Sequence, residues 1–306
     1  MMEIRDRNAF VTGGASGIGL ALSRAFAEAG ANVAIADVNQ ARLDEATTAI
    51  GEMGVRVCGI HLDVTDREAY ARAADVAERA IGPIHLLCNN AGVGFLGPLK
   101  HASYADWDWV LGVNLGGTVN GVQTFLPRML AHGEGGHIVS TASAAGLFGA
   151  TFAGIYVAAK MAVVGFMEVL RDELARDGIG VSVLCPHLVR THIYEHADLR
   201  PERYTTPGES PLPPGFADKL RAANDCGMDP AEVASQVIDA IRANRLYVIT
   251  HPELRQPIEQ RYRAMLASVA TGDVDPARLA AEEATLSFGP YQEILDAEAA
   301  MTTPEP

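Results

Sequence analysis

The stretch VTGGASGIGLAL, residues 11–22, places four glycines between an apolar run and a helical pattern. Gly13, Gly17 and Gly19 form a G-x-x-x-G-x-G turn. Glycine lets the backbone turn sharply and approach a ligand, because it carries no Cβ. The amino end of the following helix offers free N–H groups and a positive dipole end to a phosphate. The strand before the turn and the helix after it therefore predict a dinucleotide-binding βα unit, with Ser16 and Ile18 inside the turn.

Outward from this turn, short apolar runs alternate with helical patterns. The runs are rich in Val, Ile and Leu, which is typical of strands buried between two helix layers. This alternation predicts a Rossmann-type, doubly wound α/β fold with a parallel sheet of about seven strands and helices on both faces. We expect strands at 8–12, 31–37, 55–63, 84–92, 136–143, 180–186 and 246–250, and helices at 17–29, 40–52, 66–80, 104–132, 154–177 and 229–245.

The texture of the sequence changes after Thr191. Residues 199–217 contain five prolines and can continue neither a helix nor a central strand. We therefore expect a substrate lid over about 187–225. Residues 1–251 are expected to form one dinucleotide-binding and catalytic domain, and 252–306 a helical C-terminal extension.

Composition excludes several classes of function. The net charge of −14 disfavours binding to a phosphate backbone, so no nucleic-acid partner is expected. The four cysteines are scattered without a C-x-x-C pair, which predicts neither a metal site nor a redox motif. The most apolar stretch, 147–170, contains Lys160, so we expect a core helix and no membrane span. With no secretion signal expected at the N-terminus, the sequence favours a cytoplasmic protein.

Asp37 ends the second expected strand, where an acid can accept hydrogen bonds from the adenosine ribose and repel a 2′-phosphate. Arg24, the one cation between Thr12 and Asp37, falls on a helix face. The pattern favours NAD over NADP as the cofactor. Asp63 and Val64 follow the third strand and can hold the adenine, while a helix cap at the neighbouring residues is the alternative reading.

Tyr156 and Lys160 lie four residues apart, on one face of the expected helix. Interconverting an alcohol and a carbonyl compound needs a proton donor or acceptor at the oxygen. The ordinary pKa of tyrosine is about 10, and a nearby cation lowers it. Lys160 can be that cation and can also hold the ribose of a nicotinamide cofactor. By itself the pair is an ordinary surface neighbour pair in many helices.

Five motifs resolve this ambiguity through a resemblance. TGGASGIG (12–19), NNAG (89–92), Asn114, Ser143 and Y-x-x-x-K (156–160) resemble, in order and spacing, the short-chain dehydrogenase/reductase family. The resemblance covers residues 6–192 and extends less sharply to 250. It implies an NAD-dependent alcohol dehydrogenase or ketoreductase, and commonly a homodimer or homotetramer.

The resemblance also implies residue roles. Asn114 would order a water beside the lysine, and Ser143, not the nearby Ser140, has the family's thirteen-residue spacing to Tyr156. A serine hydroxyl there can donate to the substrate oxygen as charge develops. Where the family has glycine after the sixth strand, this chain has His187, which either lines the active site or packs sideways. Further cofactor contacts are expected from Asn90, Ala91, Gly92, Pro186, Val189 and Thr191.

The expected substrate pocket is apolar and aromatic, which favours a neutral, bulky alcohol over a sugar phosphate. DREAYARAAD, LRPERY and LYVITHPELRQPIE are similar to bacterial aryl-alcohol dehydrogenases, including the Cα-dehydrogenases of lignin-type β-aryl ethers. That resemblance implies a secondary, benzylic alcohol as the small-molecule substrate. An aliphatic, steroid-like or polyketide-like carbonyl and a non-catalytic NAD-binding regulator remain alternatives. The expected pocket residues are Phe95, Leu147, Phe148, Phe152, His187, Leu188 and Tyr194.

Overall fold

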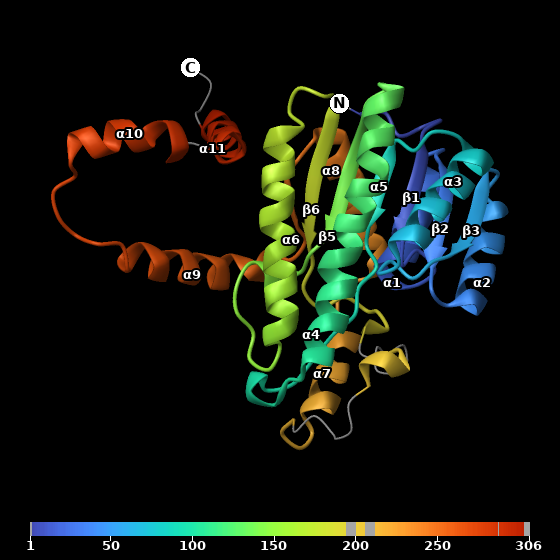
Figure 1. Ribbon diagram of the computed structural model, residues 1–306, viewed down its shortest axis with the longest axis horizontal. Coiled ribbons are helices and arrows are strands. Elements are labelled where there is room, and N and C mark those ends of the chain that lie inside the picture. Colours follow the sequence, from blue (N-terminus) through green and yellow to red (C-terminus); the bar gives the residue numbers. More distant parts are fainter. Residues whose placement is uncertain (1, 194–199, 206–211, 287, 303–306) are drawn as a thin grey trace.

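Seven parallel strands form one sheet in the order β3-β2-β1-β4-β5-β6-β7 (Figure 1). The computed structural model describes residues 2–193, 200–205, 212–286 and 288–302. The strand order reverses between β1 and β4, and at such a point the loops separate and leave a crevice at the carboxyl ends of the strands. The strands are β1 Asn8–Thr12, β2 Asn32–Asp37, β3 Val57–His61, β4 Leu86–Asn89, β5 Gly136–Thr141, β6 Ile179–Cys185 and β7 Tyr247–Ile249.

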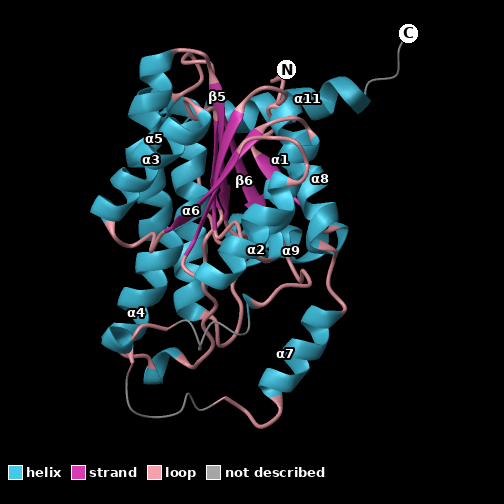
Figure 2. Ribbon diagram, turned by 90° about the vertical axis from the view of Figure 1, so that its right-hand side faces the viewer, coloured by secondary structure: helices cyan, strands magenta, loops and turns pink. Residues whose placement is uncertain are grey.

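Helices cover both faces of the sheet, which confirms the doubly wound α/β prediction (Figure 2). One face is covered by α3 (Arg67–Ile81), α5 (Gly117–His132) and α6 (Gly154–Glu173), whose apolar residues form one core cluster with the strands. The other face is covered by α1 (Gly17–Glu28), α2 (Gln40–Gly51) and α8 (Pro230–Ala243), which form a second cluster. Because the central strands are buried on both sides, their sequences are mostly apolar, and the polar residues that they contain, such as His137 and Ser182, are buried.

The helix expected over 104–132 is divided in two. Ser103 and Asp106 form a capping box that starts α4 (Tyr104–Leu111), and a π-helical turn at Gly112–Gly116 separates it from α5. Such turns change the direction of side chains and often occur at functional sites. This one buries Asn114 to 1 % exposure, in agreement with the expected interruption of the helical pattern at that residue.

The proline-rich region contains more regular structure than expected. A 3₁₀ turn lies at Glu202–Tyr204, and α7 spans Phe216–Asp225, whose start overlaps the expected loop. After Pro214 the sequence contains no proline until Pro230, so nothing prevents a helix there. The predicted pocket residue Tyr194 lies outside the described residues.

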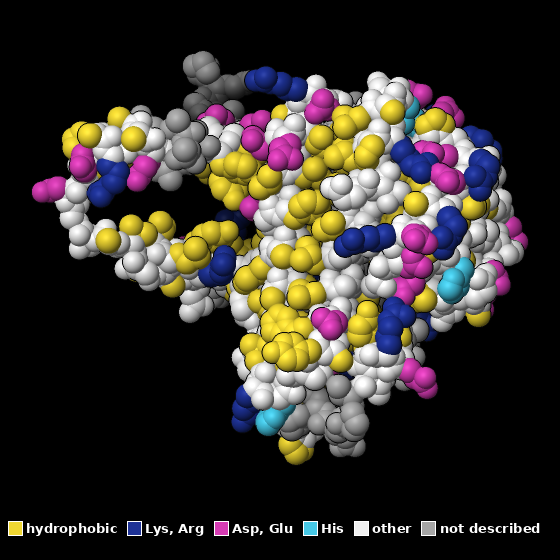
Figure 3. Space-filling model, viewed as in Figure 1, with side chains coloured by type: hydrophobic (Ala, Val, Ile, Leu, Met, Phe, Trp, Pro, Cys, Tyr) yellow, Lys and Arg dark blue, Asp and Glu magenta, His cyan; other side chains and the backbone are white. Residues whose placement is uncertain are grey.

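The C-terminal extension is helical, as expected, and comprises α9 (Arg255–Ala267), α10 (Pro276–Leu286) and α11 (Gly289–Thr302). The first two helices stand away from the body, and α11 returns to it (Figures 1 and 3). There the Tyr291 hydroxyl donates to Glu168 Oε2 at 2.9 Å, which ties α11 to α6. Within the described part of the chain, no helix has the length and apolarity that crossing a bilayer requires.

Candidate active site

A cavity opens at the carboxyl ends of the strands and collects most of the predicted site residues. It runs from the glycine turn after β1 to the amino end of α6. Among the predicted cofactor and catalytic residues, its wall contains Gly13, Ser16, Gly17, Ile18, Asp37, Asp63, Val64, Asn90, Ala91, Gly92, Ser143, Tyr156, Lys160, Pro186, Val189 and Thr191. Gly19 and Asn114 lie behind this wall.

The glycine turn is shaped for close approach of its own backbone. A Cβ on Gly19 would lie 2.0 Å from the Gly13 carbonyl oxygen, so only glycine fits there. Gly17 has φ +51° and packs against Thr191. Ser16 is the N-cap of α1, but its side chain makes no capping hydrogen bond. Ser16, Gly17 and Ile18 line the cavity, so the Ser16 hydroxyl and the N–H groups of the first helical turn are available to a ligand there. The turn therefore fits a pyrophosphate.

Asn90 holds the glycine turn against the neighbouring strands. Its side-chain amide donates to the carbonyl oxygens of Thr12 (3.2 Å) and Gly13 (3.4 Å), and its Oδ1 accepts from the Thr141 hydroxyl at 3.1 Å. The Thr12 hydroxyl in turn accepts from the Asn90 and Ala91 N–H groups. The amide thus fixes the cavity floor.

Asp37 is buried at the end of β2, with both carboxylate oxygens oriented by backbone N–H groups. Oδ2 accepts from Ala15 at 3.1 Å and Oδ1 accepts from Asn39 at 3.0 Å. The carboxylate is therefore fixed beside the glycine turn. Arg42, in the first turn of α2, lines the same end of the cavity and was not expected from the sequence. This end of the cavity therefore offers one fixed anion and one cation.

Asp63 is held by the turn that follows β3 and by an arginine from the proline-rich region. Its Oδ1 accepts from the Thr65 N–H and hydroxyl, and its Oδ2 pairs with Arg203 at 3.1 Å. These hydrogen bonds and the Arg203 charge lower the pKa of Asp63, although its partial burial acts in the opposite direction. The neighbouring cap of α3 is Asp66, whose side chain accepts from the Ala69 N–H. Asp63 therefore remains on the cavity wall beside Val64.

Ser143, Tyr156 and Lys160 meet at the other end of the cavity. Ser143 follows β5, while Tyr156 and Lys160 extend from the first turns of α6. Lys160 Nζ lies 5.6 Å from the centre of the tyrosine ring and donates to the Thr141 carbonyl oxygen at 2.7 Å. The three side chains thus form one group from two elements, as their sequence spacing indicates.

Burial dominates the acid–base properties of this group. It raises the pKa of Tyr156, and a hydrogen bond with the Ser143 side chain offsets part of that rise. Burial also lowers the pKa of Lys160 to about 8. The sequence suggests that Lys160 lowers the pKa of Tyr156, but here the ammonium group is directed to the Thr141 carbonyl and the net shift of the tyrosine is upward.

Asn114 supports the site from behind the cavity wall. Its Oδ1 accepts from the Val93 N–H at 2.8 Å and its Nδ2 donates to the Val93 carbonyl oxygen at 2.9 Å. A Cβ on Gly92 would lie 3.0 Å from Asn114 Oδ1 and 3.5 Å from Lys160 Nζ, so these groups are neighbours. The amide clamps the loop after β4. The expected role in ordering a water beside Lys160 stays a prediction.

Five of the expected pocket residues lie elsewhere. Their positions were inferred from segments near the site, but most of these side chains are needed for packing. Leu147 and Phe148 pack in the core with α6, Phe95 packs against the cluster around Trp109, and Phe152 packs edge to face against Phe216. Leu188 directs its carbonyl oxygen away from the cavity, to the N–H of Met228 and to His251. Of the expected pocket residues, His187 lines the cavity.

Other residues give this end of the cavity its apolar character. The wall beyond Ser143, Tyr156 and Lys160 is made by residues from several segments: Val93, Trp109, Val113, His192, Ile193, Pro201 and Tyr204. Trp109 is buried on α4 and stacks with Arg200, which pairs with Asp106 at 2.7 Å. The sequence signal for these residues was the aromatic pattern DWDWV and the segment RPERY, whose proximity only the fold reveals.

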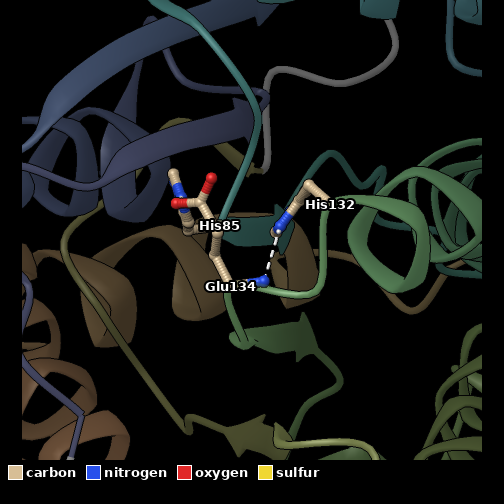
Figure 4. Close-up of side chains that lie close together, drawn as sticks. All are labelled: His85, His132 and Glu134. Atoms are coloured by element: carbon tan, nitrogen blue, oxygen red, sulfur yellow. Dashed lines mark hydrogen bonds and ion pairs between the residues drawn. The ribbon is translucent and has the colours of Figure 1, made fainter.

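A second polar cluster lies at the amino ends of the strands (Figure 4). His85, His132 and Glu134 bring potential metal-ligating atoms within 4.8 Å of one another. His85 Nδ1 accepts from the Asn8 N–H, which leaves Nε2–H to donate to Glu134 at 3.0 Å. His132 Nδ1 accepts from the Glu134 N–H, and its Nε2 faces the Ile84 carbonyl oxygen at 3.1 Å. All four ring nitrogens are thus used in hydrogen bonds, so the cluster is a structural network.

Known proteins share this architecture. The family model described as short chain dehydrogenase matches residues 7–201. A C alpha-dehydrogenase of Sphingobium sp. strain SYK-6 is 41 % identical over 277 residues, which cover 90 % of each chain. The crystal structure of a short-chain dehydrogenase/reductase from Burkholderia phymatum in complex with NAD has a TM-score of 0.84 and 36 % identity, and covers 90 % of this chain and 100 % of that one.

Apo LigD from Sphingobium sp. strain SYK-6 has a TM-score of 0.74 and 38 % identity, covering 88 % of this chain and 100 % of its own. The residues that the family model matches include the glycine turn and the segment that carries Ser143, Tyr156 and Lys160. The chain therefore belongs to the short-chain dehydrogenase/reductase family and is an oxidoreductase.

Proposed function

We propose that this oxidoreductase interconverts a secondary alcohol and its ketone with NAD, using Tyr156 as the acid/base. One observation carries the proposal: Ser143, Tyr156 and Lys160 line the same cavity as the glycine turn and Asp37. The cavity fits a dinucleotide, because the turn leaves first-turn N–H groups available and Asp37 stands at the far end. When bound there, NAD accepts or supplies the hydride.

The chain's own residues hold the cofactor and move the proton. The turn from Gly13 to Ile18 binds the pyrophosphate, Asp37 the adenosine ribose, and Asp63 with Val64 the adenine. Lys160 and Tyr156 hold the nicotinamide ribose, while the loop Asn90–Gly92 and the residues Pro186, Val189 and Thr191 border the nicotinamide. In alcohol oxidation the Tyr156 oxygen takes the hydroxyl proton, and the Ser143 hydroxyl donates to the substrate oxygen.

The preference for NAD rests on the fixed carboxylate of Asp37. A 2′-phosphate beside it would meet like charge in a partly buried site, which is costly. Arg42 on the same wall supports the alternative, NADP. Initial rates with NAD and NADP at equal concentrations distinguish them. A higher kcat/KM with NADP would overturn the preference for NAD.

The substrate is proposed to be bulky and aromatic, with a benzylic alcohol as the leading candidate. Trp109, Tyr204 and Ile193 give the cavity beyond Tyr156 an apolar wall suited to an aromatic ring. The relative named C alpha-dehydrogenase supports this class. A panel of matched benzylic and aliphatic secondary alcohols, followed at the NADH absorbance, tests it. If aliphatic alcohols have the higher kcat/KM, the aliphatic, steroid-like or polyketide-like alternative replaces it.

Two further expectations are part of the proposal. The first is catalysis itself, as opposed to a regulator that only binds NAD, and the Tyr156→Phe variant described below separates these. The second is assembly into a homodimer or homotetramer, for which light scattering gives the mass. A monomer at micromolar concentration would contradict the second expectation without affecting the first.

A further inference from the structure

His251 lies two residues after the end of β7, outside the cavity, and contacts the segment that forms one side of the cavity. The side chain is nearly buried, with 9 % exposure, and Thr250 beside it is 4 % exposed. Its Nδ1 lies 3.3 Å from the His187 backbone nitrogen, and its Nε2 lies 3.0 Å from the Leu188 carbonyl oxygen. One imidazole ring thus binds two consecutive residues of the segment after β6.

The partners of the ring determine its tautomer. A backbone N–H can only donate, so Nδ1 must be the acceptor toward His187. A carbonyl oxygen can only accept, so Nε2 must carry the proton that it donates to Leu188. The Thr250 hydroxyl, 2.7 Å from Nδ1, then also donates to that nitrogen. His251 is therefore held in one tautomer and one orientation, with the His187 N–H and the Thr250 hydroxyl sharing the lone pair of Nδ1.

The segment that His251 binds, residues 186–191, places side chains on the cavity wall. Pro186, His187, Val189 and Thr191 all line it, whereas Leu188 directs its carbonyl oxygen away. The His187 ring also packs edge to face against the His251 ring, with centroids 5.9 Å apart. His187 has ordinary backbone dihedrals, so no glycine is needed at this position. The backbone geometry here sets the direction of all four cavity-lining side chains.

Most of this segment has other supports, including the Arg190 N–H, which donates to the Met228 carbonyl oxygen at 3.0 Å. The support that depends on His251 is the bond at the His187 N–H. The Pro186 carbonyl oxygen accepts from the Ala144 N–H at 2.7 Å, and the Thr191 carbonyl oxygen accepts from Asn224 at 2.9 Å. The Leu188 carbonyl oxygen also accepts from the Met228 N–H at 2.9 Å. The His187 N–H, in contrast, donates to His251 Nδ1.

We propose that His251 is a positioning residue for cofactor binding: it fixes the backbone at His187 and Leu188 so that Pro186, Val189 and Thr191 meet the nicotinamide end of NAD. The inference rests on the proposed function, because it assumes that NAD occupies the cavity. His251 does not touch the cofactor itself. It acts through the segment that it binds.

The two ring nitrogens can be tested separately. In His251→Asn, the amide oxygen can take the place of Nδ1 and still accept from the His187 N–H. In His251→Gln, the amide nitrogen can take the place of Nε2 and still donate to the Leu188 carbonyl oxygen. Because that oxygen also accepts from Met228, the loss of the Nε2 bond should matter less. We therefore expect His251→Asn to resemble the wild type more closely than His251→Gln does.

A matched control is available at the opposite, amino ends of the strands, on β5. His137 is also buried, and its Nε2 lies 2.8 Å from the Ser182 hydroxyl oxygen. It does not line the cavity. The variants His251→Ala and His137→Ala therefore both remove a buried, hydrogen-bonded imidazole, but only the first removes support from the segment at 186–191.

The experiment measures the Kd of NAD by calorimetry, KM and kcat for NAD, and amide hydrogen exchange of peptides that cover 184–192. We expect His251→Ala to weaken NAD binding about tenfold, the scale of one or two lost hydrogen bonds, with a smaller change in kcat. Exchange at the His187 amide should quicken about tenfold or more. His251→Asn should restore most of both properties, and His137→Ala should leave both within about twofold.

The outcomes separate this inference from the proposed function. Unchanged exchange and unchanged Kd in His251→Ala would overturn the positioning role. Equal losses in His137→Ala would also overturn it, because they would show a general effect of stability. If the wild type bound no NAD, the cofactor assignment would fail and this role in cofactor binding with it, whatever the exchange data showed about the segment.

Discussion

At the side of the sheet where the strands have their carboxyl ends (the carboxyl edge), polar side chains hold the backbone in place and leave other polar groups facing the cavity. At the opposite side, where the strands have their amino ends (the amino edge), polar side chains bind one another and the nearby backbone. Asp37 orients two N–H groups yet keeps its charge on the cavity wall, and Ser16 leaves its hydroxyl unused in capping. At the other edge, His85 and His132 use every ring nitrogen within the protein.

This contrast shows which buried polar groups can form a binding site. Burial and hydrogen bonding occur at both edges, so neither identifies function. What differs is the remaining capacity to bind a ligand, and this follows from topology. In a parallel sheet the helix amino ends and the separating loops lie at the carboxyl edge, where they leave N–H groups open. At the amino ends of the strands, in contrast, the ring nitrogens of His85 and His132 are all used in hydrogen bonds within the protein.

The largest expected effect is the loss of chemistry at the carboxyl edge. Tyr156→Phe should lower kcat by about a thousandfold, because the acid/base is lost while the ring remains. NADH formation with the best alcohol of the panel measures it. Tyr247→Phe is the matched control, since that hydroxyl binds Glu168 at 2.5 Å outside the cavity. A Tyr156→Phe variant with full turnover would show that the proposed mechanism is wrong.

The next effect concerns the charge at the far end of the cavity. Asp37→Asn should shift the kcat/KM ratio toward NADP by about tenfold or more, because it removes the like charge. The amide oxygen can still accept from a backbone N–H, so the turn is largely retained. Glu134→Gln at the amino edge should leave the ratio unchanged. An equal shift in both variants would contradict a local role for Asp37.

A pH effect should arise at the amino edge. Burial, together with the nearby Arg171 charge, lowers the pKa of His137 to about 3. The unfolded chain binds a proton near pH 6.5, so between pH 6.5 and 3 the unfolded state holds more protons than the folded one. The free energy of unfolding should therefore fall as the pH falls, by up to about 1.4 kcal/mol per pH unit from this residue.

Urea unfolding between pH 7 and pH 4 measures this slope. His137→Gln should reduce it, because the amide can bind Ser182 without titrating. The exposed His101 provides the control, and His101→Gln should leave the slope as it is. An unchanged slope in His137→Gln would assign the acid sensitivity to other groups.

For the cluster of His85, His132 and Glu134 we expect no effect of added metal on stability. Zinc added at a few equivalents should leave the melting temperature unchanged, because a metal would have to displace hydrogen bonds at His85 and His132 and compete with Arg7, 3.6 Å from Glu134. A rise in melting temperature that disappears in His132→Ala would show that the cluster is a metal site and that the two edges differ less than we infer.

The fold was largely predictable, because strand and helix patterns are local. Each expected strand from 8–12 to 246–250 overlaps an observed one, and the ends differ by a few residues. The glycine turn and the Tyr156–Lys160 pair were equally visible, since their spacing lies within one turn or one helix. The start of α7 was missed because proline content masked the residues that follow.

The substrate end of the cavity was much less predictable. Phe148 and Phe152 were chosen for being apolar and near the site in sequence, but core packing requires the first and Phe216 contacts the second. Trp109 and Tyr204, which do line the cavity, lie 95 residues apart in the sequence. Only a tertiary fold brings such residues to one wall.

The family, the parallel sheet and the expected acid/base can be inferred from the amino-acid sequence alone, because they depend on residue type and short spacing. Three features required the folded chain: the choice of apolar side chains that face the cavity, the hydrogen bond from Lys160 to the Thr141 carbonyl, and the contact of His251 with the segment after β6. The physical reason is that hydrogen-bond partners and burial depend on contacts between residues distant in sequence, and burial sets both the pKa of a side chain and its remaining capacity to bind a ligand.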